Sequence, residues 1–216
     1  MKKLAAFLDE YKYLIALVST LNFLLTPIHI DVSGLNATHV VVINYSLVIL
    51  ASSLIASNKK TRARTYILGF IALSFIWIEY MYNVSTVVEV LRLISSLVLF
   101  SNFCVLLVQQ LRSIKTMNLK FILGPLLGFI YLGIIGGILF EFTHLVAPGS
   151  FQFTENFSGY SFYYFSFISI TTVGYGDITP LTASAQSLTL VMNIIGQFYL
   201  AIVIGVFVGK YINEKS

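Results

Sequence analysis

Charged residues are scarce in this sequence. Asp, Glu, Lys and Arg make up only 10% of its 216 residues, whereas 57% are hydrophobic and the mean hydropathy is +0.88. A soluble domain carries about 25% charged residues, so this composition excludes a soluble domain. We therefore expect an all-α membrane protein, because helices satisfy their own backbone hydrogen bonds in lipid.

Cysteine is nearly absent, since Cys104 is the only one. A single thiol cannot form an intrachain disulfide and gives no information about the redox compartment. The sequence also lacks clusters of His, Glu, Asp and Cys with the spacing of metal ligands or nucleophiles. We therefore predict that the protein is not an enzyme and has no cofactor. Its basic residues form no continuous soluble face, so nucleic acid is not expected as a partner.

Long apolar segments are what the sequence does contain. A hydrocarbon core of about 30 Å needs about 20 helical residues. Segments that meet this requirement lie approximately at 13–30, 38–57, 65–82, 86–111, 119–142 and 182–211. A further apolar segment at about 160–171 is too short to cross at about 1.5 Å per residue, and we expect it to enter the membrane and turn back. Lys2 and Lys3 precede an uncleaved first span, because no small-residue cleavage site follows it.

The basic residues predict the topology. If six spans follow a cytoplasmic N-terminus, the inner segments hold 12 of the 13 Lys and Arg residues: Lys2, Lys3, Lys12, Lys59, Lys60, Arg62, Arg64, Arg112, Lys115, Lys120, Lys210 and Lys215. The acidic residues Asp31, Glu141, Glu155 and Asp177 then lie outside. This distribution follows the positive-inside rule and predicts a multi-pass protein of the cell membrane with both termini cytoplasmic.

The short apolar segment is followed by residues 171–177, whose sequence is TTVGYGD. Extended backbone at membrane depth is tolerated only where protein buries it or where it lines a watery path. Carbonyl oxygens of such a backbone can replace the hydration shell of K⁺. Gly174 and Gly176 give the freedom to adopt positive φ that aligned carbonyls require, while Thr172 can add a hydroxyl. One chain forms only one wall, so a ring of subunits is expected.

This stretch resembles the selectivity filter of the tetrameric potassium channel superfamily, whose TVGYG signature is complete at 172–176. The likeness extends over about 100 residues. Aromatic residues occupy positions where the family's pore helix carries a cuff around the filter: Tyr163, Tyr164, Phe165 and Phe167. Gly196 occupies the position of the inner-helix hinge, and residues 196–201 look like the inner helix of bacterial two-span pore modules.

The resemblance implies a fold of six transmembrane helices with a re-entrant pore helix and an extended selectivity filter, assembled as a homotetramer in a lipid bilayer. It assigns K⁺ binding to Thr172, Val173, Gly174, Tyr175 and Gly176, with K⁺ in this filter as the only metal. Support for the filter is expected from Thr171, Asp177, Tyr164, Phe165 and Ile168. The cavity and gate are assigned to Gln197, Leu200, Ile204, Val208 and Ile212. Tyr164 replaces the tryptophan and Ile168 the glutamate of other members, which puts the filter's inactivation behaviour in doubt.

Two parts of the chain are expected to differ in function. Residues 113–216 form a pore domain, and residues 1–112 form a four-helix domain that resembles a voltage sensor without its charges. A sensor needs several arginines at three-residue spacing on its fourth span, but the corresponding positions read Glu89, Arg92, Ser95, Val98 and Ser101. We predict weak or no voltage dependence, with Arg92 paired to Glu89 or to Glu79. Few residues follow the last span, so no cytoplasmic regulatory domain is expected in this chain.

Several features stay open at the level of the sequence. A non-selective cation channel and a secondary transporter are the alternatives to a potassium-selective channel. The pairs Gly133 with Gly137 and Gly205 with Gly209 suit close helix contact. His144 could sense pH, although an uninvolved exposed histidine is the preferred interpretation. Glycosylation sequons begin at Asn36, Asn83 and Asn156, which are outside in the expected topology, and at Asn44, which lies at membrane depth.

Overall fold

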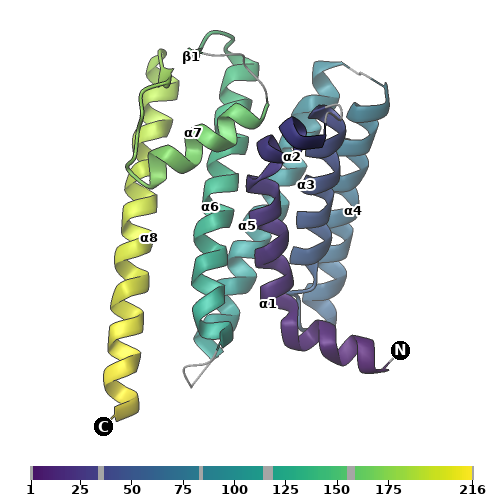
Figure 1. Cartoon of the computed structure of the whole chain (residues 1–216), viewed down its shortest axis with the longest axis vertical. Helices are drawn as coiled ribbons and strands as arrows, with labels where there is room; N and C mark the ends of the chain where they lie inside the picture. The colour runs from purple at the N-terminus through teal and green to yellow at the C-terminus, as the bar shows by residue number, and fades with distance from the viewer. Residues whose placement is uncertain (1, 34–36, 83–84, 114–118, 155–158, 216) are drawn as a thin grey trace. The chain divides into compact units, whose positions relative to one another are not determined.

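The computed structural model describes residues 2–33, 37–82, 85–113, 119–154 and 159–215. These residues are mostly helical (Figure 1). The elements are α1 (Lys2–Leu24), α2 (Thr26–Ser33), α3 (Ala37–Ser53), α4 (Lys59–Tyr82), α5 (Thr86–Ser113), α6 (Leu119–Val146), β1 (Phe151–Phe153), α7 (Tyr160–Ile170), β2 (Ile178–Pro180) and α8 (Ala183–Lys215). Lys115, Glu155 and the sequon residues Asn36, Asn83 and Asn156 lie outside the described residues.

Four of these helices, α4, α5, α6 and α8, are long and apolar enough to cross a membrane. They coincide with the expected third, fourth, fifth and sixth spans. The bent pair α1 and α2 is also long and apolar enough if it is counted as one span, which raises the number of candidate spans to five. α3 is a shorter apolar helix of 17 residues. The expectation of an all-α membrane protein is therefore confirmed.

The expected first span is not one straight helix. α1 and α2 meet at an angle of 57°, and Pro27 stands at the second position of α2. Proline lacks the backbone N–H and its ring clashes with the carbonyl four residues earlier, so an α-helix bends here. The Thr26 hydroxyl donates a hydrogen bond of 2.6 Å to the carbonyl of Phe23, which satisfies one acceptor at the break.

The chain divides into two compact units. The first comprises residues 1–114 with 118–128, and the second comprises residues 115–117 with 129–216. α6 therefore contributes its first turns to one unit and the rest to the other. In the first unit α3 packs between α1 and α4, and α4 packs on α5. Hydrogen bonds between side chains join its helices: Asn102 donates to Thr65 at 3.1 Å, and Trp77 donates to Ser46 at 3.2 Å.

In the second unit, the segment between β1 and β2 forms a loop whose two ends are held together by the pairing of these strands. β1 and β2 pair antiparallel, with Phe151 opposite Pro180 and Phe153 opposite Ile178. The strands flank α7 and residues 171–177, so the pairing closes a loop that contains both. α7 has 11 residues, a length of about 17 Å, and runs obliquely between α6 and α8 (Figure 1). Neither strand was expected from the sequence.

Candidate functional site

α7 is seated on a row of glycines in α6. A Cβ atom at Gly137 would lie 2.6 Å from the ring of Tyr163, and one at Gly133 would overlap the ring of Phe167. The expected close contact at this pair of glycines is confirmed, and its partner is α7. Tyr163 and Phe167 were expected to surround the filter, but within one chain their rings pack against α6.

Other side chains of α7 enter an aromatic core formed with α6 and β1. The ring of Phe165 lies 4.9 Å from that of Phe140 and 5.5 Å from that of Phe151. Phe165 and Ile168 are buried, and the half-buried Tyr164 packs against the same cluster. Because these rings are large and close-packed, α7 has little freedom to shift relative to α6 and β1.

The C-terminal end of α7 passes directly into residues 171–177. The carbonyl of Ile168 accepts hydrogen bonds from the backbone N–H groups of Val173 at 2.9 Å and Gly174 at 3.1 Å. Thr171 caps the helix through its backbone N–H and its hydroxyl, both of which donate to the carbonyl of Phe167. The last carbonyls of a helix have no partner within the helix. Here the backbone N–H groups of the following segment bind the last carbonyls of α7, and these hydrogen bonds fix the position of that segment.

The backbone of the candidate filter alternates in the sign of φ. Thr172, Gly174 and Gly176 have φ of 62°, 51° and 81°, whereas Val173 and Tyr175 between them do not have positive φ. Thr172 is the only non-glycine residue with positive φ among the described residues. For a β-branched residue this conformation is a true outlier, with a cost of order 1–3 kcal/mol. The sequence indicated the glycines but gave no signal for Thr172.

Residues 171–176 are all exposed in the single chain, and 74% of the Tyr175 surface is accessible. Asp177, which follows them, is anchored through its main chain. Its carbonyl accepts hydrogen bonds of 3.1 Å from both the backbone N–H and the hydroxyl of Thr154. The Oδ1 atom of Asp177 is buried and has no hydrogen-bond partner among the described residues.

α8 touches the end of α7 at the expected hinge position. A Cβ atom at Gly196 would lie 2.9 Å from Cβ and 3.2 Å from the carbonyl oxygen of Ile170. The next residue, Gln197, donates a hydrogen bond of 3.0 Å from Nε2 to that same oxygen. α8 is a continuous helix through both positions. In this structure Gly196 therefore permits close approach, a role that the sequence analysis did not assign to it.

The lower half of α8 has few contacts within the described chain. Ile204, Val208 and Ile212 are exposed, and Leu200 is half-buried. Cβ atoms at Gly205 and Gly209 would meet no other atom within 4 Å. Only 11% of the most apolar stretch of α8 is buried, against 67% of that of α6.

In the first unit, Arg92 of α5 forms an ion pair and is not part of an arginine ladder. The Nε atom of Arg92 is 2.6 Å from Oε2 of Glu79, so α5 is paired with α4. This is one of the two expected partners. Glu89 lies in the first turn of α5, where a carboxylate is favoured by the helix dipole.

The expectation that His144 is exposed is wrong. Its half-buried ring lies 5.4 Å from Phe162 and 5.9 Å from Phe153. The cause is the turn after α6, which folds β1 back over the last turns of that helix.

Comparison with known proteins agrees with this geometry. Residues 126–213 match the family Ion_trans_2, described as ion channel. No curated protein matches the chain. The matched segment runs from within α6 to near the end of α8 and includes α7 and the candidate filter. It supports the ion channel superfamily and a multi-pass membrane protein.

Proposed function

We propose that this chain is one subunit of a homotetrameric potassium-selective channel that conducts K⁺ passively across the cell membrane. The observation that carries the proposal is the alternating, exposed backbone of residues 172–176 at the end of a helix too short to span. In this reading α7 is the pore helix and 172–176 the selectivity filter. The bent pair α1 and α2 forms the first span, and α3 the second, at the lower limit of about 17 residues.

The alternation of φ suits a column of carbonyl oxygens. In an ordinary strand, successive carbonyls point to opposite sides. Reversing the sign of φ at every second residue rotates alternate peptide groups, which lets successive carbonyls face one side. A dehydrated K⁺ ion needs several oxygens at once, so the strand requires identical strands from other subunits. The exposed surface of α8 and of Tyr175 gives the area on which those subunits would pack.

The end of α7 adds an electrostatic contribution. A helix C-terminus carries roughly −0.5 elementary charge, and four such ends aimed at one axis would favour a cation below the filter. Gln197 donates to the carbonyl of Ile170, the last residue of α7, so the inner helix is attached at the base of the filter. A displacement of α8 would then act on the filter through Gln197 and the contact at Gly196. Apolar side chains farther along α8, such as Ile204 and Val208, can close the path by dewetting.

Voltage dependence is expected to be weak or absent. One charge moved across the membrane contributes about 2.3 kcal/mol per 100 mV, so four copies of Arg92 reach about 9 kcal/mol at most. A full arginine ladder supplies tens of kcal/mol. The pairing with Glu79 lowers the contribution further, because moving Arg92 requires breaking that contact.

The test is ion flux into liposomes that contain the purified full-length protein. With K⁺ concentrated inside and Na⁺ outside, we expect an electrogenic K⁺ efflux that generates a negative interior potential and does not saturate at low ion concentration. Equal passage of Na⁺ would instead indicate a non-selective channel. A saturating flux coupled to a second solute would indicate a transporter.

A further inference from the structure

The first unit contains a polar cavity at the end that carries the start of α4. Its volume is about 480 Å³. α1, the segment before α4, α4, α5 and the start of α6 all contribute to its wall. It is lined by Lys12, Tyr13, Ser57, Asn58, Thr61, Leu106, Gln109, Gln110 and Lys120. We call it the basic cavity.

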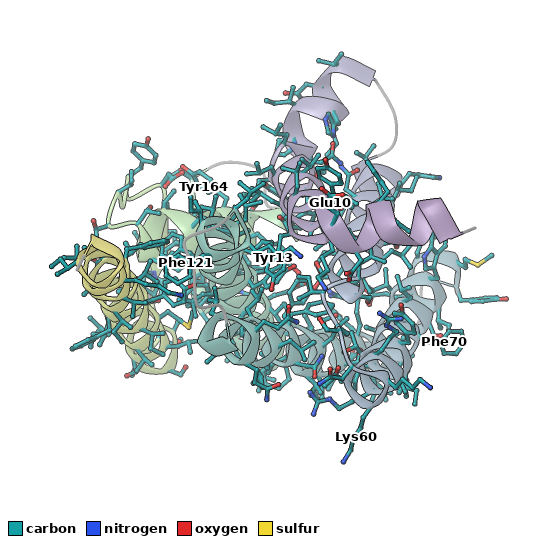
Figure 2. The ribbon with its side chains drawn as sticks, turned by 90° about the horizontal axis from the view of Figure 1, so that it is seen from below. Glu10, Tyr13, Lys60, Phe70, Phe121 and Tyr164 are labelled. Atoms are coloured by element: carbon teal, nitrogen blue, oxygen red, sulfur yellow. The ribbon has the colours of Figure 1, made fainter. Side chains whose placement is uncertain are left out.

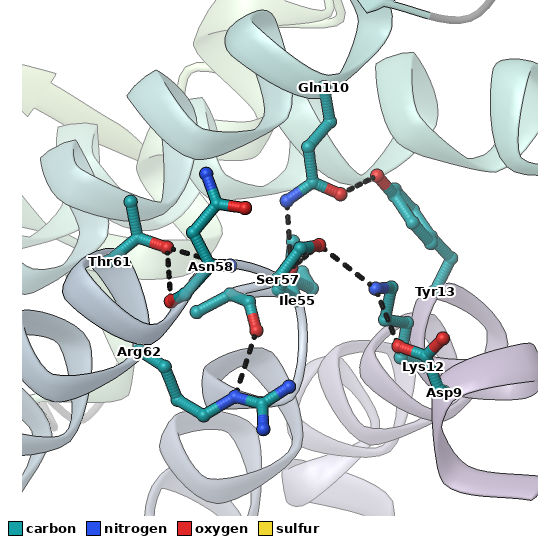
Figure 3. Close-up of polar contacts among 10 residues, drawn as sticks. Asp9, Lys12, Tyr13, Ile55, Ser57, Asn58, Thr61, Arg62 and Gln110 are labelled. Carbon is teal, nitrogen blue, oxygen red and sulfur yellow. Dashed lines mark hydrogen bonds and ion pairs between the residues drawn. The ribbon is translucent and has the colours of Figure 1, made fainter. Parts of the chain in front are cut away.

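Hydrogen bonds fix the wall of the basic cavity (Figure 3). The hydroxyl of Tyr13 donates to Oε1 of Gln110 at 2.5 Å, and Nε2 of Gln110 donates to the carbonyl of Ile55 at 2.7 Å. The ammonium group of Lys12 donates to Ser57 at 3.1 Å and to Asp9 at 2.9 Å. Only 5% of Lys12 is exposed. The position of its charge is therefore set by the fold.

Positive charge exceeds negative charge around this wall. Lys12, Lys120 and Arg62 all act electrostatically on Asp9, with Lys12 as the strongest of the three. Of these groups Lys12 and Lys120 line the cavity, whereas Arg62 and Asp9 do not, so the charged side chains of the lining are both cationic. Glu10, the next residue, is exposed and does not line the cavity. A partly enclosed excess of positive charge is unfavourable unless an anion accompanies it.

Neutral donors at the same wall suit an oxygen-rich anion. Asn58 precedes α4 and Thr61 lies in its first turn, so the positive end of the helix dipole adds to the field there. The hydroxyl of Thr61 already donates to the carbonyl of Asn58, so the side-chain amides of Asn58 and Gln109 are the neutral donors of the lining. The side chain of Gln109 is exposed at the rim. Ammonium groups, amides and a helix N-terminus together are typical of phosphate recognition.

We propose that the basic cavity binds a phosphate group. Under the proposed topology the cavity opens at the cytoplasmic surface, where anionic phospholipids attract basic residues. The phosphate can then come from a lipid headgroup or from a soluble phosphate. This site is separate from the filter, and its occupancy can be measured without ion conduction.

The test measures binding of phosphatidylglycerol, phosphatidylcholine and inorganic phosphate to the purified full-length protein by native mass spectrometry. The variant is Lys120→Gln, chosen because Lys120 is half-buried at the rim whereas Lys12 is integral to the fold. Lys60→Gln is the matched control, since Lys60 lies at the same end of α4, is exposed, and points away from the unit in Figure 2. Loss of one lysine near a headgroup should weaken binding about fivefold.

We expect Lys120→Gln to weaken phosphatidylglycerol binding about fivefold relative to Lys60→Gln. Binding of phosphatidylglycerol that inorganic phosphate does not displace assigns the lipid as the source. If inorganic phosphate displaces phosphatidylglycerol, and if Lys120→Gln also weakens the binding of inorganic phosphate, the source is a soluble phosphate. The proposal is overturned if the two variants bind phosphatidylglycerol and inorganic phosphate alike, or if neither phosphatidylglycerol nor inorganic phosphate binds.

Discussion

The two units of the chain expose different kinds of surface. The first unit exposes apolar side chains, such as Phe70 and Val32, on helices whose backbone is internally hydrogen-bonded. The second unit also exposes apolar side chains on α8, but it exposes the non-helical backbone of residues 172–176 as well. Lipid can cover the first kind of surface but cannot satisfy the second. Under the proposed function, water and further copies of the chain cover this backbone of the second unit.

The largest expected effect is at Gly176, whose φ of 81° an alanine tolerates poorly. Gly176→Ala should reduce K⁺ flux about 100-fold or more in liposomes, because the cost of roughly 1–2 kcal/mol recurs in every subunit. Gly159→Ala is the control, since Gly159 has an ordinary φ of −55° and a Cβ there would meet only Oε1 of Glu141 at 3.7 Å, an ordinary contact. Normal flux from assembled Gly176→Ala protein would refute the filter assignment.

The contact at Gly196 should give the next largest effect. A methyl group there would press on Ile170, so Gly196→Ala should destabilise the protein by about 1–3 kcal/mol and change the open probability. Thermal unfolding and single-channel recording measure the two effects. Gly205→Ala, where a Cβ would meet no other atom of the described residues within 4 Å, serves as the control. A changed ratio of K⁺ to Na⁺ permeability with unchanged opening would argue against this account.

The hydrogen bond from Gln197 should contribute less. Gln197→Leu removes the donor to Ile170, and the net loss of one such bond is about 1 kcal/mol. We expect an intermediate change in open probability, smaller than that of Gly196→Ala. Gln197→Glu keeps the shape but loses the donor, so it should change gating at least as much. If both variants gate like the unmodified protein, the inner helix is not coupled to the filter through this bond.

The smallest effect is expected in the first unit. Arg92→Gln should leave the conductance–voltage relation nearly unchanged and lower the stability by about 1 kcal/mol, because it leaves Glu79 without its partner. The double variant Arg92→Gln with Glu79→Gln should recover part of that loss. A steep conductance–voltage curve that becomes shallow in Arg92→Gln would show that this charge senses voltage.

The sequence predicted the helices well where apolar length decides the structure. α4, α5, α6 and α8 follow from segments that a bilayer would accept, and the positive φ of Gly174 and Gly176 follows from their residue type. Their assignment to a selectivity filter stays a prediction. Pro27 is visible in the sequence, but the long apolar run around it predicts a single straight span, so the bend is not apparent from composition. The 17-residue α3 ends at Ser53, where the expected segment continued to 57.

Other features depend on pairs of residues far apart in the chain. The β1–β2 pairing joins two strands of three residues, which are too short for a sequence pattern. The contacts of Gly196 and Gln197 with Ile170 arise only once α8 crosses the end of α7. The positive φ of Thr172 is imposed by hydrogen bonds to the end of α7, against its own preference. Periodicity and composition carry no information about such contacts.

The central claim concerns the oxygens of residues 172–176, and the reversal potential tests it most directly. Purified channels in a planar bilayer should be recorded with K⁺ on one side and an equal concentration of Na⁺ on the other. Our account predicts a current that reverses at a strongly negative potential on the K⁺ side, as required when K⁺ alone passes. A reversal potential near zero would contradict it.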